Sequence, residues 1–182
     1  RGFYALHKMI ADLKVVGPAA IFPHYVVAGG TKIRVGEPTH NLGTLSSGAS
    51  SVNTCVLAAA DTPVIGTHRF TGIANETAEL VAAGTVKQQL LNMALPVPSV
   101  GRIRGKAEVA ANVDTLTELA LLWGDMVLID YAATGASDGG PLYTIKDTAS
   151  ADTSGLEIVG GNVALQTLDV TVVSAAYRSD IS

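Results

Sequence analysis

Hydrophobic positions recur at a helical spacing in the first part of this chain. Over residues 1–16 apolar side chains return every three or four positions and polar side chains take the opposite side, which is typical of an amphipathic helix. The apolar side consists of Phe3, Leu6, Met9, Ile10 and Leu13. Gly17 and Pro18 follow directly and end the predicted helix. Such a helix packs either on its own domain or, as a terminal arm, on a neighbouring subunit.

Residues 17–53 hold only short apolar pieces, which Gly, Pro, Ser and Asn separate from one another. A stretch of this length exceeds an ordinary connection inside a compact domain. We therefore expect an extended arm that a partner orders. The chain is accordingly divided into an N-terminal helix and extended arm at residues 1–50 and a β-rich domain at residues 51–182.

After residue 50 the pattern changes to short apolar runs between turn residues. The predicted strands cover residues 52–59, 64–73, 85–95, 99–109, 126–131, 142–145, 156–159 and 168–173. One helix is expected over residues 116–122, with Asp114 or Thr115 as its cap; if Thr115 is the cap, Glu118 three residues later completes a capping box. Its apolar set is Leu116, Leu119, Ala120 and Leu122. Strands this regular, with one short helix among them, predict a mainly β fold: an antiparallel β-barrel or sandwich.

The composition favours a structural protein over an enzyme. Only 15% of the residues are charged, against roughly 25% in an average soluble domain. The net charge is −4 and there is no basic stripe, so the electrostatic footprint of a nucleic-acid partner is missing. No apolar run reaches the roughly 18 to 20 residues that a membrane span needs. A surface of small neutral residues packs well against other protein surfaces.

Candidate chemical motifs are sparse. Zinc ligation lacks a ligand pair, because the single cysteine and the four histidines are dispersed: Cys55, His7, His24, His40 and His68. Asp147 and Asp152 lie five residues apart with hydroxyls between them, and a solvated turn explains them better than a calcium site. Neither a nucleophile elbow nor a phosphate-binding loop is found. We expect no catalytic residues, no metal and no cofactor.

The chain has one basic cluster, at Arg102, Arg104 and Lys106. On a strand these three side chains point to the same face. The cluster is either a solvated strand face or a patch that docks on an acidic neighbouring subunit, where arginine forks bind carboxylates in pairs of hydrogen bonds.

Several segments, in order, resemble the capsid decoration, or cement, proteins of tailed bacteriophages. They are Phe70-Thr-Gly-Ile-Ala74, Val100-Gly-Arg-Ile-Arg-Gly-Lys106 and Gly124-Asp-Met-Val-Leu-Ile-Asp-Tyr131, and the resemblance covers about residues 60 to 178. It implies a non-enzymatic β-barrel or β-tulip body on the outer capsid surface, often in trimers. An N-terminal arm would touch the shell or a neighbouring cement subunit.

On this resemblance we expect a virion protein that is assembled in the host cytoplasm and binds the major capsid protein. It would stabilise the shell across capsomer boundaries as a dimer, as a trimer or beside neighbouring cement subunits. The expected contact residues are Phe3, Leu6, Met9, Ile10, Leu13, Arg102 and Arg104. The alternatives are another phage component, such as a tail part or a head-fibre base, and a β-barrel module that binds a small ligand.

Overall fold

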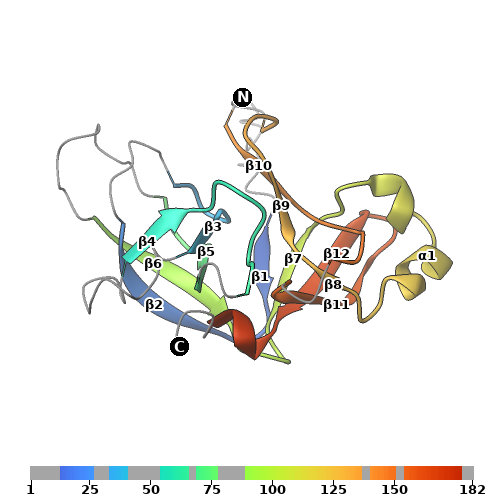
Figure 1. Cartoon of the computed structure of the whole chain (residues 1–182), viewed down its shortest axis with the longest axis horizontal. Coiled ribbons are helices and arrows are strands. Elements are labelled where there is room, and N and C mark those ends of the chain that lie inside the picture. Colours follow the sequence, from blue (N-terminus) through green and yellow to red (C-terminus); the bar gives the residue numbers. More distant parts are fainter. Residues whose placement is uncertain are drawn as a thin grey trace, which may run out of the picture.

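The computed structural model describes residues 13–26, 33–40, 54–65, 69–77, 89–136, 140–150 and 154–177. Over these ranges the chain is mainly β, with a single short α-helix, which confirms the expected fold class (Figure 1). No helix within them is long and apolar enough to cross a membrane.

Five strands pair in a closed ring, a small barrel with the order β2-β4-β3-β5-β6. Their bounds are β2 (Ala19–Val26), β3 (Pro38–His40), β4 (Thr54–Leu57), β5 (Phe70–Ala74) and β6 (Gln89–Pro96). The neighbours are antiparallel except for β2 and β4, which pair in parallel. This barrel differs from the expected antiparallel one, because it contains a parallel pair and takes β2 and β3 from the segment that was expected to form an arm.

A second, five-stranded sheet has the order β1-β7-β12-β11-β8 and is antiparallel throughout. Its strands are β1 (Lys14–Val16), β7 (Arg102–Lys106), β8 (Met126–Val127), β11 (Leu156–Asn162) and β12 (Thr167–Val172). A separate hairpin pairs β9 (Ile129–Ala132) with β10 (Leu142–Ile145). Figure 1 shows the barrel at one end of the molecule and the sheet towards the other.

One hydrophobic core joins the barrel to the sheet. Phe70 and Ile73 of β5 belong to the same buried cluster as Ile103 of β7 and Leu168 and Val170 of β12. Strand alternation places Ile103 on the core side while its neighbours Arg102 and Arg104 point outward. The outward face of the sheet is therefore fixed by the burial of its inner face.

The helical elements lie mostly at the sheet end of the molecule: η3 (Ala110–Val113) and α1 (Leu116–Leu121), with η4 (Ser174–Tyr177) after β12. The predicted capping box at α1 is confirmed. The Glu118 amide donates to Thr115 Oγ1 at 3.2 Å and the Thr115 amide donates to Glu118 Oε2 at 3.1 Å. Leu119 and Leu122 pack against the core, so this helix is anchored on one side.

The helix predicted over residues 1–16 is wrong in its described part. Lys14–Val16 form strand β1, and Lys14 lies opposite Arg104 of β7. The two β-branched residues Val15 and Val16 favour an extended backbone, and the edge of β7 supplies the main-chain partners. Residues 1–12 lie outside the described residues.

The extended arm predicted as far as residue 50 is also corrected. β2 pairs with β6 along all eight of its residues, and β3 lies between β4 and β5 in the barrel. The sequence pattern did not predict these two strands because the strands that pair with them come later in the chain. The division of the chain at residue 50 stays a prediction, but strands on its two sides pair with one another.

Candidate interaction surfaces

The outward side of β1, β7 and β12 carries a group of charged side chains. Alternation along β7 turns Arg102, Arg104 and Lys106 to this side. The strand register adds Lys14 beside Arg104 on one flank and Asp169 on the other. We call these five residues the basic face. Four cations against one carboxylate leave a surplus of three positive charges.

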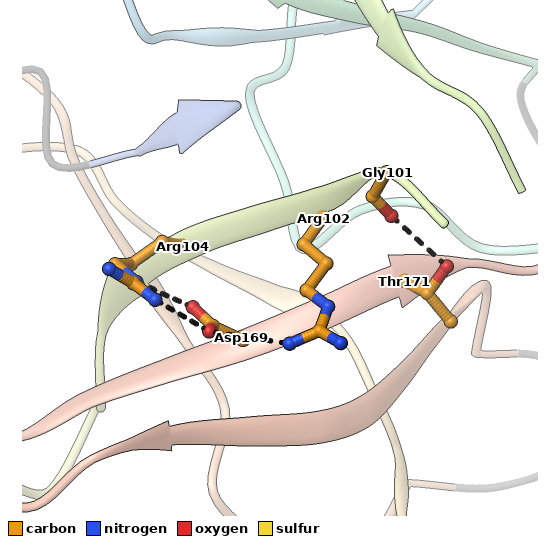
Figure 2. A network of polar contacts seen from close by, with 5 residues as sticks. All are labelled: Gly101, Arg102, Arg104, Asp169 and Thr171. Atoms are coloured by element: carbon orange, nitrogen blue, oxygen red, sulfur yellow. Dashed lines mark hydrogen bonds and ion pairs between the residues drawn. The ribbon is translucent and has the colours of Figure 1, made fainter. Parts of the chain in front are cut away.

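Arg104 and Asp169 form a bidentate ion pair at the centre of the basic face (Figure 2). Arg104 Nε donates to Asp169 Oδ1 at 2.6 Å, and Nη2 donates to Oδ2 at 2.7 Å. These hydrogen bonds and the charge of Asp169 raise the pKa of Arg104 above its ordinary value. The bidentate arginine–carboxylate pair that the sequence suggested across subunits thus exists within the chain.

Arg102 is held more loosely than Arg104. Its Nη1 lies 4.0 Å from Asp169 Oδ2, the outer limit of an ion pair, and its side chain is 48% exposed. Asp169 is the one carboxylate within that distance among the described residues. A guanidinium has five N–H donors, so Arg102 keeps donors for a further partner.

The helix α1 and the residues beside it form an exposed end of the molecule. We call residues 114–125 the α1 tip; Figure 1 shows α1 at the opposite end of the molecule from the barrel. Its large apolar side chains Leu116, Leu121 and Trp123 are 74%, 76% and 66% exposed. Asp114, Glu118 and Asp125 add three carboxylates, and the segment has neither Lys nor Arg. The tip therefore combines apolar area with negative charge.

Sequence reasoning placed Leu116 in the apolar set of this helix and overlooked Leu121 and Trp123. A signal was present, because apolar residues occur on every side of the short segment from Leu116 to Trp123. A helix that packs on one side cannot bury all of them. The surplus apolar positions are the ones that the structure leaves in water.

A second charged group ties the hairpin to the segment after β4. Lys146 Nζ lies 2.7 Å from Asp61 Oδ2 and 3.6 Å from Asp130 Oδ1. The hydrogen bond to Asp61 is the main cause that raises the pKa of Lys146, and burial is the main cause that raises the pKa of Glu108 nearby. Within the described ranges no three His, Cys, Asp or Glu residues are grouped so as to hold a metal ion. The arrangement fits a structural role, in which the ion pairs of Lys146 hold the hairpin to the segment after β4.

The predicted N-terminal contact residues are only partly described. Leu13 is 3% exposed and packs in the core, where its own chain covers it. Phe3, Leu6, Met9 and Ile10 lie outside the described residues, and their contact role stays a prediction.

No family model matches the chain, and no curated protein matches it. Among solved structures it is similar to the N base of the head fiber protein gp8.5 of bacteriophage phi29, with 13% sequence identity and a TM-score of 0.38. The similarity covers 91% of this chain and 99% of that chain. At this identity and TM-score the likeness by itself carries no argument about function.

Proposed function

We propose that this chain is a structural protein of a tailed-phage virion, a decoration protein that binds the outer surface of the head shell. The observation that carries the proposal is the exposure of Leu116, Leu121 and Trp123 on the α1 tip. Exposed apolar groups of this size are typical of protein contact surfaces, and tryptophan is enriched among the residues that dominate binding. The resemblance over residues 60 to 178 supplies the virion setting.

Decoration would stabilise the shell by repetition. A contact of standard size buries about 1,600 Å² in total, and copies placed on a lattice act together with an avidity that no single contact has. Contacts that cross capsomer boundaries oppose the separation of capsomers. The major capsid protein is the proposed partner, and Phe3, Leu6, Met9 and Ile10 are proposed to touch the shell or a neighbouring subunit.

A head-fibre base is the second candidate, and the shape of the molecule supports it. A base needs one surface for the head and another for the fibre. The barrel and the α1 tip lie at opposite ends of the molecule, as Figure 1 shows, and could serve these two contacts.

Co-sedimentation with empty head shells tests the proposal. A decoration protein saturates the shells at a fixed high ratio and raises the temperature at which they rupture. Saturation at a few copies per shell, with an unchanged rupture temperature, would favour the fibre base. An absence of binding to shells would contradict both and turn attention to a tail component or a ligand-binding module.

A further inference from the structure

We infer that the α1 tip docks on the basic face of a second copy of this chain, so that copies associate head to tail. Under this inference the exposed apolar side chains of the tip join neighbouring copies, so other surfaces of the chain would bind the shell. The inference rests on the proposed function only for its virion setting. Both surfaces lie in the described part of the chain.

The tip has the composition of a binding surface. Its helix has six residues, none of which is buried, and the capping box holds its first turn. Helices this short have little stability of their own, so packing must hold them. Leu119 and Leu122 provide that packing on the inner side. Leu116, Leu121 and Trp123 have no such role, and a partner that covers them removes apolar area from water.

Charge selects the partner surface. The tip carries Asp114, Glu118 and Asp125 without a basic residue, and the whole chain has a net charge of −4. On average, therefore, a second copy repels the tip. Among the described residues the basic face carries a surplus of three positive charges and attracts it, and complementary charge steers two surfaces together and sets their register.

The two arginines of the basic face, Arg104 and Arg102, also favour such a contact. The bidentate bond to Asp169 holds Arg104 in one orientation. Beside it, the Arg102 side chain is about half exposed. Its Nη1 lies 4.0 Å from Asp169 Oδ2, the one described carboxylate within that distance. An arginine of this kind can stack on an indole ring and donate to a carboxylate at the same time. In the proposed contact, the Arg102 guanidinium stacks on Trp123 of the second copy and donates hydrogen bonds to Asp125 of that copy.

The contact has a consequence for symmetry. The tip and the basic face are different patches of one chain, so each copy offers one of each to two neighbours. Such heterologous contacts form a closed ring when the rotation between copies closes, and an open chain of copies when it does not.

The experiment uses Trp123, which is the only tryptophan in the chain. Fluorescence emission of the full chain is recorded over a range of protein concentrations, together with the light-scattering mass. The expected result is a shift of the emission to shorter wavelengths as the mass rises. At about 1 M salt, where charges are screened beyond about 3 Å, the same shift should need at least about ten times more protein.

Charge exchange identifies the partner surface. Arg102→Glu and Asp125→Lys should each weaken association about tenfold or more, and the double variant should recover most of the loss. Leu121→Gln should also weaken it and, being on the exposed tip, leaves the fold intact even if Arg102→Glu disturbs Asp169. Glu76→Lys, which changes the charge as Asp125→Lys does but follows β5 of the barrel, is the control and should associate normally.

The outcomes separate this inference from the proposed function. Association that requires Leu121 and Arg102, without any binding to shells, upholds the contact and contradicts the decoration role. A chain that stays monomeric, with Trp123 emission shifting only when shells are added, overturns the inference and upholds the decoration role. Association that Leu121→Gln and Asp125→Lys leave unchanged also overturns it, because the interface then lies elsewhere.

Discussion

Arg104 and Asp169 lie directly opposite each other on β7 and β12, and two hydrogen bonds of 2.6 and 2.7 Å join their side chains. The carboxylate is almost fully buried while the Arg104 side chain is 40% exposed. The arginine thus neutralises a buried charge from the surface of the sheet. A buried carboxylate without its partner is strongly unfavourable, so the pair constrains which changes the face tolerates.

Replacement of Arg104 by Met should lower the free energy of unfolding by about 1 to 3 kcal/mol, because it leaves the Asp169 carboxylate buried without its main partner. Arg104→Lys keeps the charge but loses the fork, so its loss should be smaller. Arg102→Gln is the matched control and should cost about 0 to 1 kcal/mol, since that arginine is loosely held. Urea unfolding measures all three. Equal losses for Arg104→Met and Arg102→Gln would contradict the assignment of the ion pair to Arg104.

Gly101 should tolerate no side chain. A Cβ at this position would collide with the Pro18 carbonyl oxygen and lie 2.6 Å from the Val97 amide nitrogen, both of which belong to the backbone. The Gly101 amide also donates to Val97 O at 2.7 Å, so the backbone there has little freedom to shift. We expect Gly101→Ala to lower the free energy of unfolding by about 3 kcal/mol or more, measured by urea unfolding.

Gly124→Ala provides the comparison for Gly101→Ala. Gly124 has a φ of +89° and nothing within 4 Å of an added Cβ. Its replacement therefore isolates the strain of a left-handed backbone, about 1 to 2 kcal/mol. A loss at Gly101 no larger than the loss at Gly124 would show that the turn around Gly101 relaxes.

Local signals in the sequence predicted the elements that local interactions determine. The capping box of Thr115 and Glu118 spans three residues, and both of its hydrogen bonds are present. The strand at Leu142–Ile145 matches its predicted range, and Arg102 and Arg104 share a face because alternation requires it. Each of these depends on residues close together in the chain.

Partners that are distant in sequence could not be predicted. Asp169 is 65 residues from Arg104, and nothing in either neighbourhood indicates the other. Lys14–Val16 became a strand because β7 supplied an edge, which helical spacing cannot reveal. The pattern of the α1 tip identified apolar residues but not which of them would find neighbours, so Leu121 and Trp123 were overlooked.

β2 should behave as part of the folded barrel in the protein alone. Its residues lie opposite β6 from Ala19 to Val26, so its amides at ladder positions should exchange with solvent far more slowly than those of an unpaired segment. Hydrogen exchange followed by NMR tests this, with the amides of the exposed turn at Ala59 and Ala60 compared within the same sample. Exchange in β2 as fast as in that turn would show that this segment is ordered only by a partner.

The α1 cap should depend on pH. The hydrogen bond from Thr115 is the main cause that lowers the pKa of Glu118 from its ordinary value of 4.5, while Glu118 raises the pKa of the neighbouring Asp114. A lowered pKa stabilises the ionised carboxylate in the folded state, so its contribution is present above pH 4.5 and is lost as the pH falls through the lower, folded value. Exchange protection of the Leu119 amide, which donates to the Thr115 carbonyl at 3.1 Å, reports it.

Variants at Thr115 and at Glu118 separate the contributions of these two side chains to the cap. Thr115→Ala should reduce the protection of the Leu119 amide about two- to thirtyfold at neutral pH. Glu118→Gln keeps the hydrogen-bonding geometry and should remove the pH dependence instead. Thr117→Ala, on the same helix but outside the box, is the control. A pH dependence that survives Glu118→Gln would assign it to another group.

The buried phenol of Tyr143 should make the fold sensitive to alkali. Its hydroxyl donates to the Ala58 carbonyl at 2.6 Å, and burial, followed by the charge of Glu37, raises its pKa above the ordinary 10.0. The folded protein then holds this proton more tightly than the unfolded chain does. The resulting stability is complete below pH 10.0 and is lost as the pH rises from there towards the folded value.

Tyr143→Phe tests this relationship in both pH ranges. Near pH 7 it should lower the free energy of unfolding by about 0.5 to 1.5 kcal/mol, because the hydrogen bond to Ala58 is lost. Above pH 10 the variant should lose less stability per pH unit than the original protein, since the titrating group is gone. Tyr131→Phe, whose ring centroid lies 5.8 Å from that of Tyr143, serves as the control. Urea unfolding at several pH values gives the slopes, and identical slopes for Tyr143→Phe and the original protein would assign the alkaline sensitivity to another group.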